Sequence, residues 1–291
     1  MSWIEQTLES LMAAPACGYR AGGAACTEPT ALAAMALAAC DRAEAAETAC
    51  RWLVERQNRD GSLGVNEAES EPNWPTPLAV LAWQTVDAAG YASNVERAVA
   101  WILREEGKSI PQREVSGHDS TLVGWSWAAA THSWIEPTAM CVLALKRTGQ
   151  GEHARTREAI RLLADRLLPE GGCNYGNTVV LGQLLRPHVL PTGIALLALL
   201  GEEAATDPRL PKSIEYLRGE LSAGTAAVSL AYGLLGLTAH GARPAEAEAW
   251  LAAAGERALN RDASPFRLAA LALAAANDVA SLVGLPAEAA E

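Results

Sequence analysis

With 291 residues, a net charge of −11 and 50% apolar residues, the chain has the composition of a folded, acidic protein. Lys and Arg are scattered along it, which excludes the basic stripe that a nucleic-acid partner requires. Ala, the strongest helix former, is abundant, whereas Phe occurs once, so the composition predicts an all-α protein.

The sequence shows neither an export signal nor a membrane span. No apolar run reaches the roughly 18 residues that cross a bilayer. The first residues, Met1 to Glu5, carry an acid where a secretory signal carries positive charge. The six cysteines form no Cys-x-x-Cys pattern, and several lie beside Ala and Leu, as small buried hydrophobes do. We therefore expect a reduced, cytoplasmic protein without a cofactor.

A short motif recurs six times and opens a dense apolar stretch each time. Its copies are Glu28-Pro29-Thr30-Ala31, Trp74-Pro75-Thr76-Pro77, Glu136-Pro137-Thr138-Ala139, Leu190-Pro191-Thr192-Gly193 and the weaker Ala223-Gly224-Thr225-Ala226 and Ser264-Pro265-Phe266-Arg267. Because Pro is favoured at the first helical position, each copy predicts a helix start. These six helices are apolar nearly all round, so we expect them to be buried, with their starts at one end of the molecule.

Six amphipathic segments alternate with the buried ones. They cover residues 3–12, 43–57, 95–104, 156–167, 210–221 and 244–258. Six amphipathic helices alternating with six buried ones predict an inner ring wrapped by an outer ring, an α6/α6 toroid made by one domain, residues 1–291. An open superhelix fits the same alternation, but six units filling the chain favour closure.

Two segments between helices carry a more specific resemblance. Gln57-Asn58-Arg59-Asp60-Gly61-Ser62-Leu63-Gly64 resembles the repeat of the terpenoid cyclase and protein prenyltransferase superfamily, in which an outer helix ends in Gln before a Gly-turn. Leu63 stands where that repeat usually has an aromatic residue. Glu170-Gly171-Gly172-Cys173-Asn174-Tyr175-Gly176 resembles a second copy of the turn. The resemblance runs from Trp3 to Ala276 and implies a single toroid, whereas squalene-type cyclases resemble two fused barrels.

The resemblance also indicates candidate acids. Class II cyclases protonate their substrate with the middle Asp of Asp-x-Asp-Asp-Thr-Ala, and alignment on Thr138 places Glu136 at that position. Trp134 and Pro137 replace the flanking Asp residues, and Glu28 is equivalent to Glu136 in the first repeat. The Asp-x-Cys zinc motif of prenyltransferase β-subunits is absent from the sequence, which argues against protein prenylation.

The connector from His118 to Glu136 holds three of the nine tryptophans, and it falls at the predicted mouth of the ring. Aromatic faces attract cations, which a cyclisation exploits, although the same rings would also serve as a structural plug. We take Asp119 and His118 as further catalytic candidates. The candidate ligand-binding residues are Trp74, Trp125, Trp127, His132, Trp134, Asn174, Tyr175 and His188. We expect the five aromatic rings among them that are not histidines to line one continuous pocket at the mouth. Residues His118, Asp119, His132 and Glu136 suit zinc by type, but their spacing is not diagnostic, so no metal site is predicted.

Glu136 is the sharpest candidate because its protonation decides its role. Burial among Trp125, Trp127 and Trp134 would raise its pKa by several units, whereas the helix N-terminus favours the carboxylate by less than about one. A buried Glu136 would therefore be a general acid, and an exposed one would be a helix-stabilising anion. The apolar segment 178–190 is either a lid or an ordered cap over the mouth.

Three functions remain open at this stage. The first is a terpenoid-cyclase-like protein that binds or transforms an isoprenoid or similar hydrophobic small molecule in a central cavity. The second is a non-catalytic module that binds a ligand or a protein, and the third is a scaffold with a filled barrel. A central cavity of roughly 300 Å³ or more favours the first two.

Overall fold

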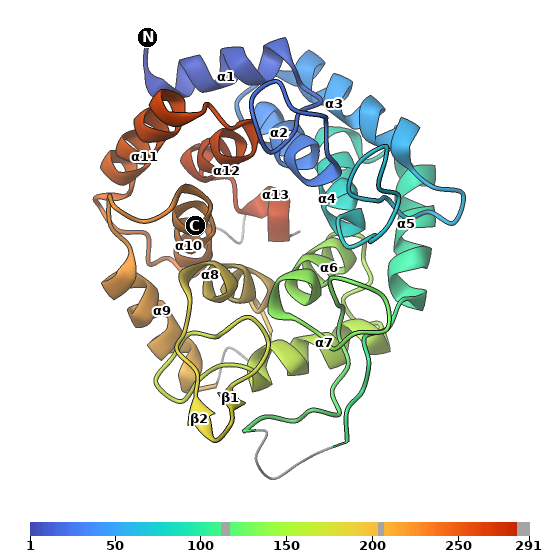
Figure 1. Ribbon diagram of the computed structural model, residues 1–291, viewed down its shortest axis with the longest axis vertical. Helices are drawn as coiled ribbons and strands as arrows, with labels where there is room; N and C mark the ends of the chain where they lie inside the picture. Colours follow the sequence, from blue (N-terminus) through green and yellow to red (C-terminus); the bar gives the residue numbers. More distant parts are fainter. Residues whose placement is uncertain (112–116, 203–206, 284–291) are drawn as a thin grey trace.

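The computed structural model describes residues 1–111, 117–202 and 207–283, and of Ala280 and Ser281 it describes the backbone only. Within these ranges almost all regular secondary structure is helical, and the chain forms the predicted α6/α6 toroid, an inner ring of six helices inside an outer ring of six (Figure 1). The inner helices are α2 (Thr27–Ala39), α4 (Thr76–Asp87), α6 (Ile135–Arg147), α8 (Val189–Ala198), α10 (Ala227–Ala239) and α12 (Pro265–Ala276). The outer helices are α1 (Trp3–Ala13), α3 (Ala43–Arg56), α5 (Ala92–Arg104), α7 (Ala154–Asp165), α9 (Arg209–Glu220) and α11 (Ala247–Arg261).

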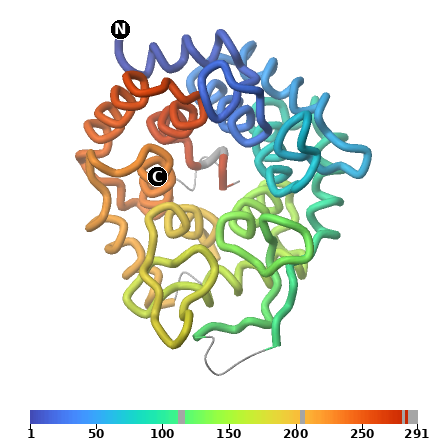
Figure 2. The backbone as a smooth tube through the Cα atoms, in the orientation of Figure 1, coloured from blue at the N-terminus to red at the C-terminus, as the bar shows by residue number. Residues whose placement is uncertain are grey.

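The ring closes because α12, the last inner helix, packs against α2, the first. Figure 2 follows the chain once around the ring, from blue through green to red, until the red helices lie beside the blue ones. The hydroxyl of Ser264, just before α12, donates a 2.6 Å hydrogen bond to the carbonyl of Tyr19, just before α2. The alternation of buried and amphipathic helices therefore produces a closed ring rather than an open superhelix.

The recurring prolines lie in or next to the first turn of the inner helices, but not all at the first position as expected. Pro265 is the first residue of α12 and Pro75 caps α4, whereas Pro29, Pro137 and Pro191 are the third residues of their helices. The first four N–H groups of a helix have no intrahelical acceptor, so Pro is tolerated throughout that turn. Glu28 and Glu136 consequently lie inside their helices, at the second position. The weak fifth copy is also offset, since α10 begins three residues after Gly224.

The threonine of the motif has a structural role in four of the repeats. The Oγ1 atoms of Thr30, Thr76, Thr138 and Thr192 accept the backbone N–H of Cys17, Leu63, Trp125 and Cys173 at 3.1, 2.9, 3.0 and 3.0 Å. All eight residues are buried. Because a buried N–H without a partner is costly, each threonine fixes the connector that precedes its inner helix.

The Gly-turns are explained by contact with the next outer helix. Gly61 and Gly171 have φ of +98° and +95°, and a Cβ on either would lie 2.2 or 2.4 Å from a backbone oxygen, that of Arg97 on α5 or Lys212 on α9. Only glycine satisfies both the left-handed backbone and the close approach. The Nε2 of Gln57 donates to the carbonyls of Gly61 and Asn94, which ties the end of α3 to α5.

The centre of the ring is filled. A short helix, α13 (Ala280–Val283), follows α12 and lies within the inner ring (Figure 1). The void left on the axis measures about 10 Å³, less than one water molecule needs. Its walls are Leu32, Met35, Leu78, Leu81, Met140, Leu143, Ile194, Leu197, Tyr232, Leu273 and Leu282. Among the residues that the structure describes, this pocket is too small to be the roomy central cavity that a cyclase-like reaction would use.

The insertion before α8 forms a two-stranded hairpin, β1 (Val179–Val180) paired with β2 (Gln183–Leu184). Its tip residue, Leu181, is 97% exposed, so the hairpin projects from the ring rather than packing over the mouth as a cap. Along the described ranges, no helix combines the length and apolarity that crossing a bilayer requires.

Candidate functional site

Glu28 lies at the second position of α2 and is buried. Burial raises its pKa to about 7, and a 2.6 Å hydrogen bond from the Tyr19 hydroxyl to its Oε2 opposes part of that rise. The positive end of α2 would favour the charged form, but burial dominates. This carboxyl therefore titrates near neutral pH.

Glu136 occupies the equivalent position of α6 and is partly buried. Burial raises its pKa to about 7, and the negative charge of Glu28 adds to the effect. The two carboxyl groups, from inner helices separated by α4, thus lie close enough to influence each other's environment. This agrees with the expectation that burial outweighs the helix end at Glu136.

Three tyrosines surround the carboxyl pair. Tyr232 belongs to α10, lies at the axis and is only 7% exposed; burial and the charges of Glu28 and Glu136 raise the pKa of its hydroxyl. The pKa of Tyr19 is raised by burial and by Glu28, and that of Tyr175 by burial and by Glu136. We call Glu28, Glu136, Tyr19, Tyr175 and Tyr232 the axial cluster. It combines two titrating carboxyls with neutral hydroxyls, of which that of Tyr232 belongs to a residue lining the ring axis, whereas Tyr19 and Tyr175 are exposed residues of the connectors.

The tryptophans expected beside Glu136 lie elsewhere. Trp74, Trp125 and Trp127 line a cavity of about 530 Å³ whose walls come from α4, α5 and α6, and neither Glu136 nor Glu28 contributes to them. Trp101 of α5, which the sequence did not single out, completes the wall. We call this space the Trp cavity. Three of the five aromatic residues expected to share a pocket therefore do so, away from the carboxyl pair.

Trp134 and Tyr175 do not line the Trp cavity. Trp134 caps α6 and stacks on His132 with ring centroids 4.5 Å apart, and Tyr175 stacks on His188 at 5.0 Å. Asn174 orders the connector before α8, since its Nδ2 donates to the carbonyl of Arg186 at 2.7 Å. The expectation of one continuous aromatic pocket is wrong for Trp134 and Tyr175, because each ring packs on a neighbouring histidine.

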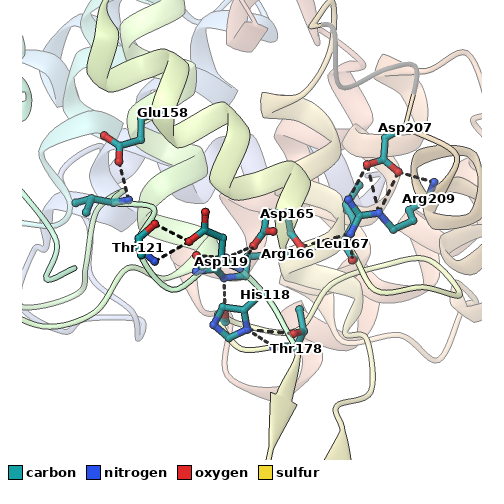
Figure 3. Close-up of polar contacts among 12 residues, drawn as sticks. His118, Asp119, Thr121, Glu158, Asp165, Arg166, Leu167, Thr178, Asp207 and Arg209 are labelled. Carbon is teal, nitrogen blue, oxygen red and sulfur yellow. Dashed lines mark hydrogen bonds and ion pairs between the residues drawn. The ribbon is translucent and has the colours of Figure 1, made fainter. Parts of the chain in front are cut away.

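His118 and Asp119 lie in a polar network at the end of outer helix α7 (Figure 3). The Nδ1 of His118 is 3.0 Å from the Thr178 hydroxyl, and Asp119 Oδ1 accepts from the N–H and hydroxyl of Thr121. The Thr121 hydroxyl is the largest cause that lowers the pKa of Asp119. An ionised aspartate bound by its own loop orders that loop and holds no proton to donate.

Arg166 anchors this network to the ring. It pairs with Asp165 and donates to the carbonyls of Asp119 and Gly176. His132 and His118 both line a neighbouring cavity of about 150 Å³. His132 Nε2 is buried without a hydrogen-bond partner in the described part of the chain. No three His, Cys, Asp or Glu side chains among the described residues converge closely enough to hold a metal ion.

The comparisons with known proteins establish the fold alone. No family model matches the chain, and no curated protein does. Two solved structures described as a glycosidase, a single-residue variant and the wild type, superpose with TM-scores of 0.61 and 0.59 at 12% identity, covering 98% of this chain and 97% of theirs. Native alpha-2-macroglobulin from Escherichia coli, from domain MG7 to the C-terminus, gives a TM-score of 0.52 at 16% identity. That match covers 94% of this chain, which spans 42% of the macroglobulin chain.

Proposed function

We propose that this toroid transfers a proton to an isoprenoid-like hydrophobic molecule at the axial cluster, as a small relative of the terpenoid cyclases. The observation that carries the proposal is the pair of buried carboxyls, Glu28 and Glu136, whose pKa values are both raised to about 7. A general acid works best when its pKa lies near the working pH.

The surroundings of the two carboxyls divide their roles. Tyr19 donates a hydrogen bond to Glu28, which favours its charged form, whereas both influences on Glu136 favour its protonated form. Glu136 is therefore the proton donor, and Glu28 is the carboxylate that stabilises positive charge developing on the substrate. With the axis filled, the substrate lies over the mouth, and an epoxide or allylic oxygen is a better proton acceptor than a plain alkene.

The test is a panel of isoprenoid alcohols and epoxides, incubated with the protein and analysed by gas chromatography and mass spectrometry. We expect turnover with an optimum near pH 7, because Glu136 loses its proton above that pH and Glu28 loses its charge below it, and we expect turnover to be lost in Glu136→Gln. Glu47→Gln, on the exposed face of α3, is the matched control. Turnover that persists in Glu136→Gln refutes the assignment of the acid.

A second candidate is the non-catalytic ligand- or protein-binding module, and the filled axis favours it. It predicts binding of panel members, seen as a change in tyrosine or tryptophan fluorescence, without any product. Nitrophenyl glycosides belong in the same panel because glycoside hydrolysis also uses a pair of carboxyl groups. If the protein hydrolysed these glycosides, its substrate class would be a sugar and not an isoprenoid. The cytoplasmic location that we propose is supported by six cysteines that form no disulfide.

A further inference from the structure

The Trp cavity is a second concave site, separate from the axial cluster. Trp74, Trp101, Trp125 and Trp127 line its volume of about 530 Å³, which is within the range of small-molecule sites. The rings of Trp74 and Trp127 meet edge to face, with centroids 4.6 Å apart. Proline and alanine side chains complete the apolar part of the wall, and Asn73 and Ser126 add polar groups to it.

All the charged residues that line the Trp cavity are acidic. They are Asp60, Glu71, Glu105 and Glu106. Three of them, Asp60, Glu71 and Glu106, are exposed, so the negative charge lies toward solvent, while Trp125 is buried. No side chain of Lys, Arg or His is among the lining residues that the structure describes. An anion would be repelled, and a cation would be attracted before it reaches the rings.

Two guanidinium groups bind backbone carbonyls of residues that line the cavity. Arg104 donates to the backbone carbonyl of Asp60 at 3.2 Å, and Arg155 donates to the carbonyl of Glu105 at 2.7 Å. Arg155 also lies 4.7 Å from the centroid of the Trp125 ring and is not among the cavity's lining residues. Trp125 of the wall thus already makes a cation–π contact within the protein. The carboxylates of Glu71, Glu105 and Glu106 have no ion-pair partner among the described residues.

We propose that the Trp cavity binds an organic cation with a quaternary or methylated ammonium group. The face of an aromatic ring attracts such a cation, and its methyl groups pack on tryptophan without the hydration that a primary ammonium retains. The exposed carboxylates of Asp60, Glu71 and Glu106 attract the cation at long range, and the aromatic wall contacts it. The same headgroup occurs free, as in choline, or on a methylated lysine of another protein.

Calorimetric titration of the full chain tests this with choline, a trimethyllysine peptide, ethanolamine and the neutral choline isostere 3,3-dimethylbutan-1-ol. We expect choline to bind about 5- to 30-fold more tightly than the neutral isostere, the range that one desolvated cation–π contact supplies. We also expect ethanolamine to bind more weakly than choline. If the peptide binds more tightly than choline, the natural ligand is a methylated side chain of another protein. If choline binds more tightly, the natural ligand is a free metabolite.

Two variants locate the binding. Trp127→Leu should weaken choline binding about 5- to 30-fold, whereas Trp250→Leu on α11, also partly buried, should leave it unchanged. The double variant Glu71→Gln/Glu106→Gln changes two surface residues without endangering the fold and should weaken binding most at low salt. Equal affinity for choline and its neutral isostere, no binding at millimolar choline, or full affinity in the double carboxamide variant at low salt would each overturn the proposal. Circular dichroism checks that Trp127→Leu is folded.

Discussion

Glu28 should make the protein less stable as the pH rises through neutrality. Its pKa rises from the ordinary 4.5 of a glutamate to about 7 because folding buries it, so the folded chain binds a proton that the unfolded chain has released. The stability that Glu28 contributes is therefore fully present below about pH 4.5, is lost between about 4.5 and 7, and does not change above that range. The pKa difference corresponds to about 3 kcal/mol, an order-of-magnitude value.

The substitution Glu28→Gln removes this titration while keeping an oxygen that accepts the hydrogen bond of Tyr19. Urea unfolding of both proteins at several pH values between about 4.5 and 8.5 gives the difference in unfolding free energy at each pH. A cost of the amide that does not depend on pH has no effect on how this difference changes with pH. We expect the unfolding free energy of the variant to rise by about 3 kcal/mol relative to that of the native protein over this pH range. Glu47→Gln, whose carboxylate pairs with Arg51 on the surface of α3, is the control and should show a nearly flat difference. A flat difference for Glu28→Gln as well would refute the burial of a titrating carboxyl at the axial cluster.

Two further substitutions test how the ring is held together. Thr138→Val keeps the shape of the side chain but leaves the buried N–H of Trp125 without its acceptor, so urea unfolding should show a loss of about 1–3 kcal/mol. Thr148→Val, whose hydroxyl bonds only to carbonyls of its own helix, should cost much less, and equal costs would contradict a special role for Thr138. Leu282→Ala removes a buried side chain from the axis and should cost about 2–5 kcal/mol. An unchanged unfolding midpoint for Leu282→Ala would mean that α13 contributes nothing to the core.

The fold could be predicted from the sequence because its signal is repeated and local. Each Pro-Thr motif lies at or beside the start of an inner helix, and each amphipathic segment needs a buried surface to cover. Glu28 and Glu136 could be found for the same reason, since both occupy one position of the repeat. The burial that raises their pKa values follows from that position in a closed ring.

Tyr19, Tyr232 and Trp101 were missed because nothing in their local sequence marks them. Tyr232 reaches the axis from α10, and it meets Glu28 and Glu136 only because the ring brings three separate helices together. The filling of the axis was equally hidden, since α13 follows the last motif and belongs to no repeat. The tryptophans were separated from Glu136 because Glu136 faces the axial cluster, whereas its neighbour Pro137 lines the Trp cavity. Adjacent residues on one helix thus serve two different sites.

Closure of the ring between α12 and α2 has a consequence for synthesis on the ribosome. The side of α2 that packs against α12 is made early, and α12 is the last of the inner helices to be made. Until α12 has emerged, the nascent chain carries on α2 an apolar edge that no helix of the early repeats covers. Folding of the N-terminal repeats is therefore incomplete until α12 has emerged, and the exposed edge is where a chaperone would bind a stalled or truncated chain.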